Sequence, residues 1–277
     1  MTAAPDAEPS GARRLMGLTE GRYDGHVHLF STDLPMAEGR RYTPTHDAPL
    51  DRLAELLRAN GLDGALVVQP SFLGTDNSHL LDRLEASRGI AGLTLRGVAV
   101  VDPTISPDEM AALSEGGIVG IRLNLAGTDA LPDLASATWQ THFAAAAALG
   151  WHVELHIEGP RLPPILPALL DSGTPLVIDH FGRPDPAEAV NCAGFRALLA
   201  APPDRVTVKV SAAYRVFADL PSNEAARRCA PLYRALYERF GVEGLVWGSD
   251  WPWTQHEGRH SYAETLAWCD GWRSRSA

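Results

Sequence analysis

The chain has 277 residues, of which 45% are hydrophobic and 21% charged, so it can bury a substantial core. Its formal net charge of -10 disfavours binding to nucleic acid or to an anionic membrane surface, because both need a basic face on the protein. No apolar run approaches the roughly 20 residues of a membrane span.

The amino-terminal residues and the cysteines indicate in which cellular compartment the protein works. Residues 1–18 are rich in Ala, Pro, Asp, Glu and Ser and lack the apolar segment of a secretory signal, so we expect a disordered leader over residues 1–20 and a single domain over residues 21–277. The three cysteines are scattered and never form a Cys-x-x-Cys pair, which argues against a disulfide framework and a zinc–thiolate site. We therefore expect a cytoplasmic protein; no feature predicts its oligomeric state.

Short apolar segments alternate with longer helical patterns from Tyr23 onward, which is typical of βα units around a parallel sheet. The predicted strands are Asp24–Phe30, Ala65–Pro70, Leu95–Val101, Val119–Leu125, His152–Ile157, Leu176–His180, Val206–Ser211 and Leu245–Asp250. The predicted helices between them are Leu50–Asn60, Asn77–Ser87, Pro107–Glu115, Trp139–Leu149, Leu162–Asp171, Ala193–Ala200 and Asn223–Phe240. This succession favours a (β/α)8 TIM barrel, with its active site at the carboxyl ends of the strands, over an open doubly wound sheet.

Two segments depart from this regular pattern. The connection from Ser31 to Pro49 is long, rich in Gly and Pro, and carries the basic sequence Gly39-Arg40-Arg41-Tyr42-Thr43-Pro44, so we interpret it as a lid or substrate loop. Only Ser261–Trp268 is available for the closing helix, which predicts a short helix and an incompletely capped barrel.

Polar side chains gather at the predicted strand ends: His26, His28, Arg122, Asn124, Glu154, His156, Asp179, His180, Lys209, Ser211 and Asp250. Because residues i and i+2 of a strand share a face, His26 and His28 can point together into the barrel mouth. The adjacent Asp179 and His180 must diverge by the same rule. We expect His180 to point inward and Asp179 to form an ion pair or a supporting hydrogen bond.

Four of these residues, His26, His28, His156 and Asp250, offer nitrogen and oxygen ligands for zinc or another divalent first-row ion, with a position left for water. A bound metal can bring the pKa of that water to about 7 and so create a nucleophile at neutral pH. Taken singly, Asp250 could cap a helix and His156 could be a hydrogen-bonded core residue. Their convergence from three predicted strands favours a functional site.

Three motifs carry a family resemblance: Asp24-Gly25-His26-Val27-His28, Ile178-Asp179-His180-Phe181-Gly182-Arg183-Pro184 and Trp247-Gly248-Ser249-Asp250-Trp251-Pro252. With all three in this order, the chain resembles the amidohydrolase-related (amidohydrolase 2) family from about Tyr23 to Trp253. Within that family it is most similar to the lactonase type, which includes 2-pyrone-4,6-dicarboxylate lactonase and the sugar and muconolactone lactonases.

The resemblance implies a distorted TIM barrel that hydrolyses a lactone. Asp250 would be the general base for water, and His180 would polarise or protonate the substrate near its carbonyl. Relatives differ in their use of metal, because decarboxylase members bind zinc through a histidine at the end of strand five, whereas the pyrone lactonase has a tyrosine there and works without metal. His156 therefore favours a divalent metal such as zinc or manganese, with metal-independent catalysis as the alternative.

The resemblance also implies the residues that bind the substrate. Arg122, Arg183 and Arg215 match arginines that hold substrate carboxylates, and arginine is suited to bidentate carboxylate contacts. Tyr42 and Ser71 match further binding positions. The chain lacks one arginine that the pyrone lactonase has after strand four, which disfavours a dicarboxylate. A monocarboxylated, neutral or sugar lactone therefore stays open as the small-molecule substrate.

Two other functions are compatible with the same residues. The first is a lyase, a non-oxidative decarboxylase of an aromatic or muconate-type acid, which would release carbon dioxide in place of a net proton. The second is a barrel that binds a ligand without turning it over.

Overall fold

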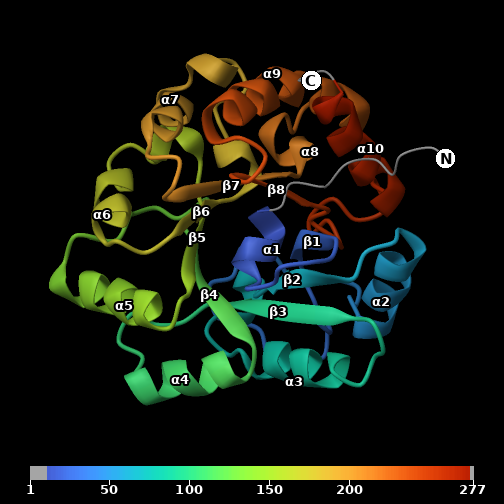
Figure 1. The fold of residues 1–277 in the computed structure, drawn as a ribbon, viewed down its shortest axis with the longest axis vertical. Helices are drawn as coiled ribbons and strands as arrows, with labels where there is room; N and C mark the ends of the chain where they lie inside the picture. Colours follow the sequence, from blue (N-terminus) through green and yellow to red (C-terminus); the bar gives the residue numbers. More distant parts are fainter. Residues whose placement is uncertain (1–10, 275–277) are drawn as a thin grey trace.

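Eight parallel strands follow one another around a nearly closed barrel in the computed structural model of the chain, which describes residues 11–274 (Figure 1). The strands are β1 (Tyr23–Val27), β2 (Gly64–Val68), β3 (Thr94–Ala99), β4 (Ile118–Asn124), β5 (His152–His156), β6 (Leu176–Ile178), β7 (Val206–Ser211) and β8 (Leu245–Gly248). A parallel bridge between Val27 and Trp251 joins the first strand to the chain just beyond the last. The predicted (β/α)8 barrel is therefore confirmed.

The helices form a ring outside the strands (Figure 1). They are α2 (Leu50–Ala59), α3 (Ser78–Ser87), α4 (Pro107–Glu115), α5 (Ala137–Ala148), α6 (Leu166–Asp171), α7 (Ala193–Ala200), α8 (Ala213–Val216), α9 (Ser222–Phe240) and α10 (Tyr262–Arg273), with short 3-10 turns η1 (Ser71–Leu73), η2 (Gly159–Arg161), η3 (His180–Gly182) and η4 (Ala189–Asn191). Leucines three or four residues apart explain the packing of α2, because Leu50, Leu53 and Leu57 are all buried on one face. Within residues 11–274, no helix is both long and apolar enough to cross a membrane.

The amino-terminal segment is folded from Gly11 onward. Helix α1 (Gly11–Leu15) lies near the centre of the barrel in Figure 1, and Ala12, Leu15 and Met16 are buried in an apolar cluster with inward-facing strand residues such as Leu66. Residues 11–16, which the sequence assigned to a disordered leader, thus include a helix whose apolar side chains are buried. Residues 1–10 of that leader lie outside the described residues.

The closing helix is longer than the sequence pattern predicts. Helix α10 extends to Arg273, and Ser261 begins it with a reciprocal capping box in which Glu264 is the partner. Trp268 and Trp272 are buried on its inner face. The expectation of an incompletely capped barrel is thus wrong, because the helix continues through the polar residues after Trp268 and buries Trp272 as well.

His152 lies in the barrel interior, where its ring packs so closely on Gly120 that a Cβ at residue 120 would lie 2.6 Å from Nε2. Burial, together with the nearby positive charge of Lys209, lowers the pKa of His152 to about 3. The folded protein therefore keeps this ring neutral at a pH where the unfolded chain protonates it.

We expect this difference to make the protein less stable in mild acid. The contribution of neutral His152 is fully present above the unfolded pKa of about 6.5 and is lost as the pH falls towards 3, so between pH 6.5 and 5 it should remove about 1.5 kcal/mol of unfolding free energy. Urea unfolding at several pH values measures this slope. His152→Gln should flatten the slope; an unchanged slope in this variant would contradict the assignment.

Candidate active site

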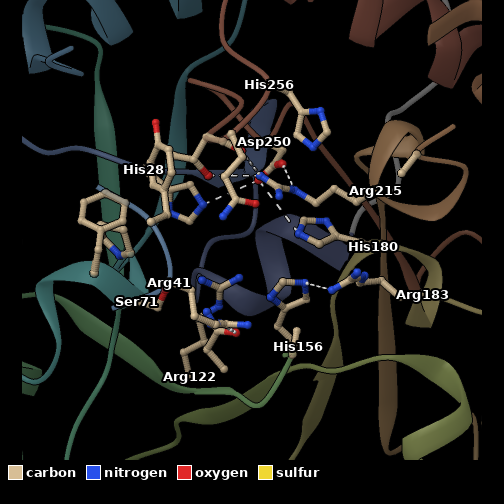
Figure 2. Close-up of a pocket in the computed structure, with 18 residues that line it drawn as sticks. His28, Arg41, Ser71, Arg122, His156, His180, Arg183, Arg215, Asp250 and His256 are labelled. Carbon is tan, nitrogen blue, oxygen red and sulfur yellow. Dashed lines mark hydrogen bonds and ion pairs between the residues drawn. The ribbon is translucent and has the colours of Figure 1, made fainter. Parts of the chain in front are cut away.

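A cavity opens at the carboxyl ends of the strands and is lined by most of the residues that the sequence singled out (Figure 2). Those residues are His28, Tyr42, Ser71, Arg122, His156, His180, Arg183, Arg215 and Asp250. His26 is absent from the lining because it is fully buried beneath the cavity, in contact with Asp250. The barrel therefore brings residues from every third of the chain to one place.

Asp250 has two carboxylate oxygens in different surroundings. Its Oδ2 accepts hydrogen bonds from the hydroxyl of Tyr214 and from Nε of Arg215, the latter at 2.7 Å. Its Oδ1 has no hydrogen-bond partner among the described residues. Burial opposes ionisation of Asp250, but Arg215 and the neighbouring histidines outweigh it and hold the pKa of this carboxyl well below its usual range. Asp250 is thus an ionised carboxylate with one oxygen fixed and one available.

Three imidazole nitrogens surround the available oxygen. The Nε2 atoms of His26, His28 and His180 lie 3.5, 3.6 and 4.0 Å from Oδ1 of Asp250. Both His180 and Asp250 have positive φ angles, 51° and 58°, which is uncommon for residues other than glycine and often occurs at functional sites. Burial lowers the pKa of all three histidines, so they are neutral near pH 7.

The hydrogen bonds of His28 and His156 fix where their protons lie. Nδ1 of His28 is 2.7 Å from the carbonyl oxygen of Val68, which can only accept, so Nδ1 carries the proton and Nε2 keeps a lone pair towards Asp250. Arg183 donates to Nε2 of His156 at 3.3 Å, so the proton of His156 is on Nδ1. His28 is therefore poised as an acceptor or ligand, whereas the equivalent nitrogen of His156 is already engaged.

A buried group of charges lies beneath the cavity. Lys209 donates to Glu154, lies 3.0 Å from Nδ1 of His26 and lies 3.7 Å from Asp179. Arg122 donates to Asp179 at 2.9 Å. Burial and the charge of Asp179 raise the pKa of Glu154, whereas His26 and the two cations hold the pKa of Asp179 low in spite of its burial. The expected ion pair of Asp179 is thus confirmed, and its cationic partners are Arg122 and, at the longer distance, Lys209.

The described residues can hold a divalent metal. His26, His180 and Asp250 each offer a ligand atom within 4.8 Å of the others, and the buried Nε2 of His26 and Oδ1 of Asp250 both lack hydrogen-bond partners in this part of the chain. His28 supplies a further lone pair beside the same oxygen. An ammonium can only donate, so Lys209 favours the His26 proton on Nε2; metal binding there would require the proton on Nδ1, where Asp179 accepts at 3.4 Å.

The structure brings the predicted metal ligands together only in part. His26 and Asp250 belong to the group just described, and His28 adjoins it, but His156 belongs to neither group of candidate ligands among the described residues. Its ring lies beside that of His180, with centroids 5.1 Å apart, and its Nε2 faces Arg183. His180, which the sequence assigned to the substrate, takes the place expected for His156.

Asp179 and His180 both point into the barrel, which corrects the expectation that they diverge. Strand β6 ends at Ile178, two residues earlier than predicted, and the positive φ of His180 turns its side chain towards Asp250. Alternation along a strand therefore no longer applies at this position. Asp179 continues the inward face of the strand and reaches Arg122.

The predicted substrate residues lie around the rim with different partners. Arg215 is bound to Asp250, Arg122 to Asp179, and Arg183 to His156, while Ser71 begins η1 at the cavity wall. Tyr42 lines the cavity, but its hydroxyl donates to Glu257. The arginines thus orient acids and imidazoles of the site as well as facing the cavity.

Other residues line the cavity without a predicted role in the site, among them Arg41, Asn124 and His256. Asn124 ends β4 two residues after Arg122, and the sequence already placed it among the polar residues at the strand ends without giving it a role. Arg41 stands next to Tyr42 in the basic loop, and His256 lies in the long connection after β8. Spacing carries no signal for loop residues of this kind, because their direction depends on the tertiary fold.

Comparisons with known proteins agree with this geometry. The family described as Amidohydrolase matches residues 23–273, so the chain belongs to that family. It is 33% identical over 245 residues to a 2-pyrone-4,6-dicarboxylate hydrolase of Comamonas testosteroni, covering 85% of this chain and 78% of the relative. It is 29% identical over 236 residues to a 4-sulfomuconolactone hydrolase of Hydrogenophaga intermedia, covering 84% of this chain and 75% of the relative.

A solved structure is similar over almost the whole chain. It is the crystal structure of a candidate 2-pyrone-4,6-dicarboxylic acid hydrolase from Acinetobacter baumannii with citric acid bound, which superposes with a TM-score of 0.85 at 32% identity and covers 92% of this chain and 93% of that one. The fold and the arrangement of strand ends are therefore those of amidohydrolase barrels.

Proposed function

We propose that this protein is a lactonase, a hydrolase that opens the ring of a small lactone carrying an anionic group. The observation that carries the proposal is the unpaired Oδ1 of Asp250, which faces three neutral imidazoles at the floor of a cavity rimmed by arginines. The names of the relatives, hydrolases of a pyrone dicarboxylate and a sulfomuconolactone, support the same reaction and the same kind of substrate.

The residues of the site have different roles in the hydrolysis. Oδ1 of Asp250 accepts the proton of the attacking water, while Tyr214 and Arg215 keep the carboxylate ionised and correctly turned. His180 lies 4.0 Å away and acts at the carbonyl, where negative charge develops as water adds. Ring opening then breaks the bond between the acyl carbon and the ring oxygen, and the proton held at Asp250 passes to the leaving oxygen.

A divalent ion, zinc or manganese, would be held by His26, His28, His180 and Asp250. When bound, it lowers the pKa of a coordinated water towards 7 and polarises the carbonyl. Without it, the carboxylate and imidazoles can still carry out general acid–base catalysis on the activated ester of a lactone. The three buried, free cysteines suit a reducing compartment, and we propose that the enzyme acts in the cytoplasm.

Proton release against a panel of muconolactones, pyrone carboxylates and sugar lactones tests the proposal. Each substrate is run with added zinc or manganese and, separately, with a chelator. Hydrolysis that the chelator removes would support the metal site; hydrolysis indifferent to it would assign the reaction to Asp250 and the histidines alone. Carbon dioxide release from an aromatic or muconate-type acid would favour the decarboxylase, and binding without turnover would favour the non-catalytic barrel.

A further inference from the structure

Four arginines line the cavity, and two of them are matched by carboxylates of the site. Arg215 is 2.7 Å from Asp250, and Arg122 is 2.9 Å from Asp179. Arg183 is 3.9 Å from Glu158 and donates one N–H to His156. Arg41 donates to the neutral side chain of Asn124 at 3.3 Å and forms no ion pair within residues 11–274. Arg41 is therefore the lining arginine whose charge is least compensated.

Arg41 reaches the cavity by crossing the loop that follows β4. Nη1 of Arg41 passes Gly127 so closely that a Cβ there would lie 2.4 Å from it. Gly127 also has a φ of +67°, a conformation that favours glycine. A residue with a side chain would therefore push the guanidinium away, and the glycine leaves the space that the guanidinium fills.

The loop that carries Arg41 is tied down on both sides. At its base, Phe30 pairs with Ala48 in an antiparallel bridge, and Asp47 accepts a hydrogen bond from the backbone of Thr32 at 2.7 Å. At its tip, the hydroxyl of Tyr42 donates to Glu257, which belongs to the connection after β8. The residue next to Arg41 is thus anchored to the neighbouring connection after β8, so the position of Arg41 is set by the fold.

The positive charge of Arg41 acts on Arg183, which also lines the cavity. Burial lowers the pKa of Arg183, Glu158 opposes this, and the charges of Arg215 and Arg41 lower it further. In the view of Figure 2, Arg41 and Arg183 lie on either side of His156. An anionic group between these two guanidinium groups would relieve their mutual repulsion and could accept charge-assisted hydrogen bonds.

We propose that Arg41 is a specificity-determining residue that binds an exocyclic carboxylate of the substrate, in the part of the cavity shared with Asn124 and Arg183. This inference rests on the proposed lactonase function, since it assigns the end of the substrate that does not react. Residues 125–136, which follow β4, contain no Lys or Arg, so Arg41 supplies a positive charge there from a different loop. The enzyme is thereby selective for acidic lactones over their neutral counterparts.

The adjacent Arg40 provides a matched control. It lies in the same loop, donates to Thr43 at 2.8 Å and to the carbonyl of Ala37 at 3.2 Å, and does not line the cavity. Arg41→Ala should lower kcat/KM by roughly 10- to 100-fold for a carboxylated lactone, mainly through KM, and by less than about threefold for its methyl ester. Arg40→Ala should leave both values near wild type, and Arg41→Lys should recover part of the loss.

Equal losses on the acid and the ester, or an Arg40→Ala effect as large as that of Arg41→Ala, would overturn the assignment. A binding measurement separates it from the lactonase proposal. Citrate, which presents three carboxylates and needs no turnover, is titrated calorimetrically into the wild-type protein, Arg41→Ala and Arg40→Ala. At least tenfold weaker binding in Arg41→Ala alone would support the role of Arg41 even if no lactone were hydrolysed, whereas affinities that do not differ, including no binding in any of them, would contradict it.

Discussion

Asp250→Asn should reduce kcat for the best lactone substrate by about 10³-fold while changing KM little. The amide cannot accept a proton from water, and it replaces the carboxylate that pairs with Arg215, so both the base and its orientation are lost. Steady-state kinetics on purified protein measures the effect, with circular dichroism to establish that the variant is folded.

Tyr214→Phe is the matched control for this loss. It removes the hydroxyl that donates to Oδ2 of Asp250 but keeps the carboxylate and its ion pair with Arg215, so we expect a decrease in kcat of about tenfold or less. If Asp250→Asn retained activity within tenfold of wild type in folded protein, another group would have to be the base, and the proposed mechanism would be wrong.

The barrel was predictable because its signals are local. Each β-rich segment is followed by a helical one, and this alternation alone specifies parallel strands with crossover helices. Side chains two positions apart share a face, so the pair His26 and His28 could be placed at one end of the barrel before any contact was known. The structure confirms that both approach the same carboxylate oxygen.

The parts that sequence reasoning missed depend on long-range geometry. Lys209 is 183 residues from His26 in the chain, and only closure of the barrel sets them 3.0 Å apart. Arg41 needs the space above Gly127, in a different loop. His180 points inward as expected, but it shares that direction with Asp179 because the backbone turns left-handed at His180, which no period predicts. Periodicity therefore predicted where the site lies, but not which of its side chains contact one another.

Lys209→Met should destabilise the protein by about 3–5 kcal/mol, the usual cost of breaking a buried ion pair by removing one partner. The ammonium is fully buried between Glu154 and Asp179, and without it a single cation, Arg122, faces two carboxylates. Proton uptake by Glu154, whose pKa is already raised, would offset part of this cost. Denaturant unfolding at pH 7.5 measures the change in free energy.

A double-mutant cycle tests whether the pair is the cause. Glu154→Gln alone leaves Lys209 with fewer acceptors, whereas the double variant removes one charge of each sign, so it should be less destabilised than the sum of the single changes by 1 kcal/mol or more, on the order of a buried coupling. Additive losses would show that packing, and not charge, explains the effect of Lys209→Met.

Lys209 also influences whether Nε2 of His26 can bind a metal or instead carries the proton that points at Asp250. While Lys209 donates to Nδ1, the proton of His26 lies on Nε2 and points at Asp250; in Lys209→Met the proton can move to Nδ1 and bond to Asp179. Nitrogen NMR of the histidine rings should report this exchange of tautomers, and the variant should bind zinc more tightly than wild type. An unchanged tautomer with unchanged zinc affinity would mean that Asp179 already takes the His26 proton in the wild-type enzyme, and that Lys209 serves only to balance the buried acids.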